Sequence, residues 1–416
     1  MDLVGGLVFV CVFLIGLCAV EHYARRSPLP IVCWVVLFGA AYGMLNKFAF
    51  PGWPVLQPTS DVILYLLLPV LIFDSSRNLN LKVSQKMAIP SAMLASLGIL
   101  VSAFVMAIPL RLFSSLPWMD ILLFSAIMSA TDPVAVSAVF TQFKVPQKLR
   151  MLIEGESLLN DGTTVILFML LFGKVIEGHE LLFYRGVAFF VLSVAGAIVL
   201  GVVAGWVGVA VLRKWKALKD HFIGPLFPLL IVYLVFCAAQ AGLDISGVLA
   251  VMAATLTMKI LMNRMTPEEK PSRNQLEFYR DFWEFLGTLA NAILFFLLGV
   301  EIGSHTGEVA WRLMGVAVIA LVLSRSIVVY GFSLLFRLLG IRLPMSWQHV
   351  LNLGGLKGAL SVALILMIPR DYIYRDIFLL AALVMSFFTL FVNTLSLRVY
   401  LRYTKLPDAH GSARSS

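Results

Sequence analysis

Apolar residues occupy long stretches of the chain, and polar residues are confined to short segments between them. Each apolar stretch is about twenty residues long, which is the length that an α-helix needs to cross a bilayer. We count thirteen such segments along the chain. They cover 3–21, 29–45, 59–76, 87–110, 118–140, 150–173, 183–212, 221–240, 243–263, 278–301, 309–338, 346–368 and 373–400. The pattern predicts an all-α polytopic membrane protein with about 13 transmembrane helices.

The composition favours the same class of protein. Of the 416 residues, 60% are hydrophobic and only 13% are charged, whereas a soluble domain carries about 25% charged residues. Residues 1–20 lack the basic start and the small-residue cleavage site of a signal peptide, so they are expected to remain as the first helix. We expect one transmembrane transporter unit over residues 1–403. A polar cytoplasmic tail, residues 404–416, is too short to fold alone.

The basic residues predict the orientation in the membrane. The formal net charge of +9 would suggest nucleic-acid binding in a soluble protein, but in a membrane protein basic residues gather in cytoplasmic loops. Of the 32 Lys and Arg residues, 23 lie in alternate loops, seven in the opposite loops and two inside spans. We therefore expect a multi-pass protein of the inner or plasma membrane, with its N-terminus outside, its C-terminus cytoplasmic and no nucleic-acid partner.

One predicted span, 118–140, carries a charge and a helix breaker at its centre. Thr131, Asp132 and Pro133 follow one another there, and proline both removes a helix hydrogen bond and disfavours helix at the residue before it. Bare backbone at this depth is tolerated only where protein buries it or water reaches it. The sequence predicts a helix break near Ala130-Thr131-Asp132.

A second span, 346–368, has a weak point of its own. Its segment LGGLKG, residues 353–358, holds three glycines within five residues, and glycine is a poor helix former. The two interrupted spans are seven places apart in the order, so they run in opposite directions. Interrupted helices in matching places of inverted halves indicate a transporter's binding site. The alternative is that the glycines only permit close helix packing.

Acidic residues lie inside the spans, where ionisable groups are costly and usually functional. The span 150–173 opens with EGESLLNDG, which begins at Glu154. Ser157 and Asp161 are four residues apart and share one helix face, and Glu156 and Asn160 share the neighbouring face. Another acid, Asp74, ends the span 59–76 near the cytoplasmic side.

These groups suit the binding of a small cation. Hard cations prefer oxygen ligands, and Asp132, Asp161, a hydroxyl group and freed backbone carbonyls supply them. Because burial disfavours the charged form of a carboxyl group, a proton and a metal ion compete for the same oxygens. Such competition couples the two flows and predicts cation–proton exchange. The alternative is that the buried acids only neutralise the two basic residues inside spans, Arg325 and Lys357.

The remaining buried polar residues are interpreted as supporting groups rather than ligands. Lys357 lies among the glycines, so it either offsets the carbonyl ends of the broken helices or pairs with Glu156. Arg325 is expected to hold another buried acid. The Asn160 amide is expected to tether the loosened backbone near Thr131 through hydrogen bonds.

Five segments of the sequence resemble the NhaP-type sodium/proton antiporters, in the electroneutral NhaP/NHE branch of the monovalent cation/proton antiporter superfamily. They are SATDPVAVSAVF, EGESLLNDGTTVILF, LLPVLIFDSS, FFLLGVEIG and LNLGGLKGALSVAL. The resemblance covers the chain from residue 67 to about residue 366 and implies the NhaA-like antiporter fold, with two inverted repeats and crossed broken helices. The inverted halves would be about 1–173 and 221–400, with 183–212 as linker helix.

The resemblance also implies roles for the site residues. Asp161 matches the family's essential ion-binding aspartate. Asp132, Thr131 and Ser157 match the positions that surround the Na⁺ ion, and Asp74 matches an acid that completes the site.

The resemblance further implies a stoichiometry and an assembly. The pair Asn160-Asp161 is similar to that of electroneutral exchangers, which implies exchange of one Na⁺ for one H⁺. The resembled family usually has arginine where this chain has Lys357, and a lysine does not form the bidentate pair with Glu156 that an arginine forms. Homodimers are implied, with transport helices over 87–173 and 309–400 and with dimerisation or scaffold helices over 1–76 and 221–301.

The sequence supports alternative functions to different degrees. The first alternative is a K⁺/H⁺ antiporter with the same mechanism, because the ligand types do not fix the size of the cation. A passive cation channel is a remote alternative, since the sequence offers paired broken helices and titratable acids rather than a continuous pore. No enzyme is expected, because the six histidines show no metal-ligand pattern such as HExxH. The expected ligands are the transported Na⁺ or Li⁺ and H⁺, with no cofactor.

Overall fold

All regular structure in the described part of the chain is helical, and this computed structural model contains no strand there. The described residues are 3–24, 26–27, 29–48, 61–178, 183–215, 223–266, 272–304, 311–369, 371–404 and 406. The all-α prediction is therefore confirmed. The predicted tail lies outside the described residues except for residues 404 and 406.

The helical elements follow one another through the described chain with short connections. In order they are α1 (Leu3–Ala24), α2 (Ile31–Phe48), η1 (Val62–Leu67), α3 (Leu68–Asn78), α4 (Leu81–Ala95), α5 (Leu97–Phe113), α6 (Trp118–Ile127), α7 (Val134–Phe140), α8 (Gln147–Val175), α9 (Phe183–Lys214), α10 (Ile223–Cys237), η3 (Ala238–Gly242), α11 (Gly247–Asn263), α12 (Arg273–Ser304), α13 (Trp311–Leu338), α14 (Met345–Leu353), α15 (Ala359–Leu366), α16 (Arg375–Phe388), η4 (Thr389–Asn393) and α17 (Thr394–Tyr403). The η elements in this series are π-helical turns that continue into neighbouring α-helices.

Within the described residues, each of the thirteen predicted apolar segments coincides with one helix or with a run of consecutive helical pieces. Helix ends differ from the predicted ones by a few residues; the segment predicted over 150–173, for example, is α8. Eight helices among the described residues are long and apolar enough to cross a membrane, and shorter apolar helices accompany them. The exact number of crossings stays a prediction.

The helices group into two compact units. The first unit comprises residues 1–58, 81–157 and 292–416, and the second comprises residues 59–80 and 158–291. Helix α8 begins in the first unit and continues into the second. The predicted inverted halves, and the predicted separation of transport helices from dimerisation helices, stay predictions.

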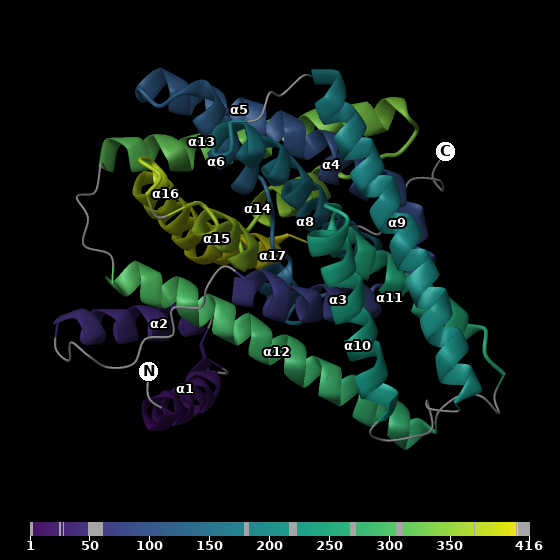
Figure 1. The fold of residues 1–416 in the computed structure, drawn as a ribbon. Helices are drawn as coiled ribbons and strands as arrows, with labels where there is room; N and C mark the ends of the chain where they lie inside the picture. Colours follow the sequence, from purple (N-terminus) through teal and green to yellow (C-terminus); the bar gives the residue numbers. More distant parts are fainter. Residues whose placement is uncertain are drawn as a thin grey trace. The chain divides into compact units, whose positions relative to one another are not determined.

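Within the first unit, α5 packs against α6 and α13, and α15 packs against α6 and α16 (Figure 1). The packing is apolar and close. The ring of Phe124 on α6 stacks on that of Phe378 on α16 with centroids 5.1 Å apart, and the Trp347 side chain on α14 is fully buried. These contacts hold the half-helices that carry the predicted site.

Glycines allow two pairs of helices to approach closely. In the first unit, Gly299 and Gly303 of α12 lie against the backbone of α2, and Gly39 of α2 lies against α12. In the second unit, Gly201 and Gly205 of α9 lie against α11. In both pairs the glycines are four residues apart, which is the spacing that lets helices in a bilayer pack backbone to backbone.

The α2–α12 contact gives a testable prediction. A methyl group at Gly299 would collide with the Val36 carbonyl oxygen, so we expect Gly299→Ala to lower the free energy of unfolding by about 1–3 kcal/mol. Thermal unfolding of the purified protein in detergent measures the loss. The matched control is Gly315→Ala on α13, where an added methyl group meets nothing within 4 Å. Equal melting temperatures for the two variants would contradict the prediction.

Candidate ion-binding site at two broken helices

Both predicted helix breaks are present, and they are bonded to each other. One separates α6 from α7 around Asp132, and the other separates α14 from α15. The Asp132 N–H donates to the Leu356 carbonyl oxygen at 2.8 Å. The prediction of two broken helices is therefore confirmed, and each break satisfies part of the backbone that the other leaves bare.

Two donors from the second break bind backbone carbonyls released at the end of α6. The Lys357 ammonium donates from Nζ to the Ala130 carbonyl at 2.8 Å, and the Ser361 hydroxyl donates to the Ile127 carbonyl at 3.1 Å. Carbonyl ends of helices carry partial negative charge, so the lysine offsets it. Of the two arrangements predicted for Lys357, the structure shows the contact with carbonyl oxygens. The Lys357 N–H in turn donates to the Thr389 hydroxyl at 3.0 Å.

The Asp132 carboxylate lies at the start of α7. Its Oδ1 atom accepts the N–H of Val134, the first residue of α7, at 2.8 Å. Its Oδ2 atom lies so close to Gly358 that a side chain there would overlap it. Gly358 directly precedes α15, so this carboxylate is next to two helix N-termini, whose free N–H groups favour negative charge.

Two buried hydroxyl groups, those of Thr131 and Ser157, meet at the first break. The Thr131 and Ser157 oxygens are 3.1 Å apart, which brings the first break against α8. Both residues are almost fully buried. The break thus places two hydroxyl oxygens next to backbone that has left the helix, and all of these are ligand types that a hard cation prefers.

Glu156 is bound by Arg325 of α13, so the expectation that Arg325 holds a different acid is wrong. The two guanidinium nitrogens Nη1 and Nη2 lie 2.5 and 3.0 Å from the two carboxylate oxygens, and Nη2 also donates to the Leu351 carbonyl at 2.9 Å. The side chains of Arg325 and Glu156 are 13% and 3% exposed. Gly355 leaves room for the arginine, because a methyl group there would lie 2.7 Å from its Nε. The bidentate pair fixes α13, α8 and the end of α14 together.

The other supporting residues have local partners. Glu154 accepts a hydrogen bond from the Ser137 hydroxyl of α7 at 3.3 Å. Asn160 is buried, and its backbone carbonyl oxygen accepts from the Thr163 hydroxyl at 3.1 Å. The expected tether between the Asn160 amide and the backbone near Thr131 stays a prediction.

Asp74 and Asp161 belong to the second unit. Arg77 binds Asp74 on one oxygen, Oδ1, with Nη2 at 2.7 Å and Nε at 3.1 Å. Asp161 follows Ser157 by one turn of α8 and is partly buried. Their approach to Asp132 stays a prediction.

Sequence reasoning missed two residues at the break, Ser361 and Thr389. Ser361 lies three residues after Gly358, so its position at the start of a half-helix was a usable signal. Thr389 binds the Lys357 N–H across 32 residues. Nothing local in the sequence marks such a partner, because the contact exists only after α16 packs on α15.

Residues 9–403 match the family described as "Sodium/hydrogen exchanger, transmembrane". The chain belongs to this family. The predicted resemblance to sodium/proton antiporters is confirmed, and the family consists of multi-pass membrane transporters rather than enzymes.

Individual sodium/proton antiporters are similar to this chain along most of its length. The Na⁺/H⁺ antiporter NhaG of Bacillus atrophaeus is 30% identical over 412 residues, which cover 94% of this chain and 73% of the relative. The Na⁺/H⁺ antiporter NhaH of Halobacillus dabanensis is 30% identical over 350 residues, which cover 82% of each protein. The structure of the sodium proton antiporter MjNhaP1 from Methanocaldococcus jannaschii matches with a TM-score of 0.69 at 16% identity, over 96% of this chain and 100% of that one. The structural match supports the antiporter fold.

Proposed function

We propose that this exchanger carries Na⁺ or Li⁺ across the membrane in exchange for H⁺. One observation carries the proposal: two broken helices bond to each other beside Asp132, with the Thr131 and Ser157 hydroxyls 3.1 Å apart at the same break. Membership of the sodium/hydrogen exchanger family supports the same cation. The curated relatives NhaG and NhaH are both Na⁺/H⁺ antiporters.

The proposed cation site consists of oxygen ligands only. Asp132 and Asp161 supply carboxylates, Thr131 and Ser157 supply hydroxyl or backbone oxygens, and Asp74 completes the site. Sodium is a hard cation that binds such oxygens. Asp132 and Asp161 are partly buried, and burial favours a carboxyl group that is neutralised by a cation or by a proton.

Competition for the same carboxylates couples the two flows. A Na⁺ ion that enters displaces the proton, and a proton that enters displaces Na⁺. If the site crosses the membrane only when it is occupied, neither ion leaks alone, and alternating access produces exchange. Asn160 next to Asp161 adds no second titrating acid at this point of α8, which supports an electroneutral exchange of one Na⁺ for one H⁺.

The setting in the membrane is part of the proposal. The excess of Lys and Arg in alternate loops supports an N-terminus outside and a cytoplasmic C-terminus, in the cell membrane. We further propose a homodimer, in which the scaffold helices anchor the assembly while the transport helices move. Chemical cross-linking of the purified protein in nanodiscs measures the number of subunits.

A transport assay tests the proposed exchange. In proteoliposomes that are acidic inside, Na⁺ or Li⁺ added outside is expected to raise the internal pH, because each entering cation drives out a proton. Clamping the membrane potential at zero or at about −100 mV should leave the net rate nearly unchanged, since a 1:1 exchange moves no charge. Proton release by K⁺ but not by Na⁺ would select the K⁺/H⁺ alternative, and a strong effect of voltage would contradict the stoichiometry.

A further inference from the structure

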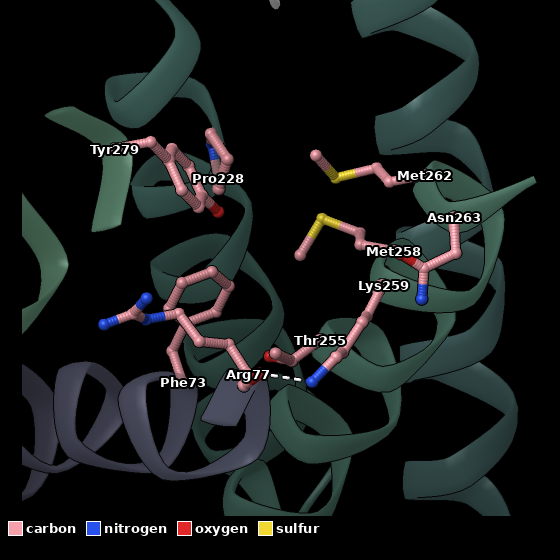
Figure 2. Close-up of a pocket in the computed structure, with 9 residues that line it drawn as sticks. All are labelled: Phe73, Arg77, Pro228, Thr255, Met258, Lys259, Met262, Asn263 and Tyr279. Carbon is pink, nitrogen blue, oxygen red and sulfur yellow. Dashed lines mark hydrogen bonds between the residues drawn. The ribbon is translucent and has the colours of Figure 1, made fainter. Parts of the chain in front are cut away.

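A lysine of α11 holds the end of the helix that carries Asp74. Lys259 lies opposite the last turn of α3 in the second unit, and its Nζ atom donates to the Arg77 carbonyl oxygen at 2.5 Å (Figure 2). The same atom donates to the Leu79 carbonyl oxygen at 2.5 Å. The last carbonyls of a helix have no partner within the helix. A cation supplied by another helix therefore ends α3 at a fixed place.

The residue whose backbone Lys259 holds is the residue whose side chain binds Asp74. The Arg77 guanidinium points away from Lys259 in Figure 2, and it contacts Oδ1 of Asp74 with Nη2 at 2.7 Å and Nε at 3.1 Å. Its Nη2 also lies 3.4 Å from the Arg280 carbonyl of α12. On the other side, Gly287 of α12 leaves space for the carboxylate, because a methyl group there would lie 2.7 Å from Oδ2.

Lys259 is half-buried beside a mainly apolar pocket. A cavity of about 180 Å³ lies beside it, lined mainly by apolar groups that include Phe73, Met258 and Met262 (Figure 2). An ammonium group on an apolar wall loses hydration, which is offset here by the two short bonds to carbonyl oxygens. The Lys259 ammonium group is thus held at the C-terminal end of α3 by the Arg77 and Leu79 carbonyl oxygens.

We infer that Lys259 is a positioning residue for cation binding, acting through Arg77 on the Asp74 carboxylate. The inference rests on the proposed function, since Asp74 is a member of the proposed site. Without Lys259 the last turn of α3 loses its partner, Arg77 loses its fixed backbone, and Asp74 is held in more than one orientation. A ligand that is less well oriented binds the cation more weakly, whereas the maximal rate at saturating Na⁺ depends less on it.

The test compares lysine variants in the proteoliposome assay, with initial rates measured over a range of Na⁺ concentrations. We expect Lys259→Met to raise the apparent KM for Na⁺ on the order of tenfold with a smaller change in maximal rate. Methionine has a similar length and matches the apolar wall, so folding should be retained. Lys259→Arg keeps the donors and has the cavity beside it, so it should restore a KM near that of the wild type.

Two controls separate positioning from a general structural effect. Lys47 donates to the Ser304 carbonyl at 2.7 Å and so also binds the end of a helix, in the first unit; Lys47→Met should leave the KM unchanged. In an Arg77→Met background, Lys259→Met should add no further increase, because the link to Asp74 is already missing.

The outcomes distinguish this inference from the proposed function. Absence of Na⁺-driven proton release in the wild type would overturn both. Exchange in the wild type with an unchanged KM in Lys259→Met would overturn the inference alone. So would an additive increase in the double variant, since the lysine would then act by a route other than Arg77.

Discussion

Asp132→Asn is expected to reduce Na⁺-driven proton release to the level of protein-free liposomes, and Asp161→Asn is expected to do the same. An amide has nearly the shape of a carboxylate, but it carries no negative charge and is not protonated near neutral pH. A site with one of these amides can therefore neither balance a bound Na⁺ ion nor return with H⁺. Because the proposed exchange needs both occupancies, the loss should be complete rather than partial.

The fold should survive the change at Asp132. The carbonyl oxygen of the introduced amide can still accept the N–H of Val134, which Asp132 accepts at 2.8 Å. The matched control is Asp281→Asn, the same chemical change at a carboxylate that is 66% exposed and paired with Arg280. The control should transport like the wild type. Persistent exchange in both site variants would show that the proposed ligands are wrong.

Arg325→Met is expected to lower the free energy of unfolding by about 3–5 kcal/mol, since it leaves a buried carboxylate without its partner. The Glu156 side chain is 3% exposed, and both of its oxygens are bound by this arginine. The Leu351 carbonyl at the end of α14 loses a donor as well. Thermal unfolding in detergent measures the effect, and yield in the membrane should fall with it.

A second variant isolates the unpaired charge as the cause. Replacing both members, as in Arg325→Met with Glu156→Met, should recover most of the lost stability, because two apolar groups of similar size can replace a buried ion pair at little cost. The exposed pair Arg273–Glu277 gives the control: Arg273→Met should cost roughly 0.5 kcal/mol or less. If the double variant is less stable than Arg325→Met alone, the unpaired charge is not the cause.

The two breaks could be predicted because their causes are local. Proline at position 133 lacks an N–H and disfavours helix at Asp132, whatever surrounds it. The glycines between residues 354 and 358 weaken a helix in any context. The long apolar segments likewise reflect the bilayer, which requires about twenty apolar residues for each crossing.

The partners of the buried charges could not be predicted because their causes are distant. The sequence suggested Lys357 as a partner of Glu156 and assigned Arg325 to another buried acid, because nothing in it ranks distant cations. The packing of α13 beside α8 and α14 brings Arg325 into contact with Glu156, although the two residues are 169 positions apart in the sequence.

The sequence by itself determined the membrane class, the family and the places where helices must break, since bilayer length, proline and glycine act within a few residues. Only the tertiary structure decided which carbonyl Lys357 meets, and that Lys259 holds the end of α3. A buried cation binds whichever acceptor the packed helices bring within about 3 Å, and sequence distance places no limit on that choice.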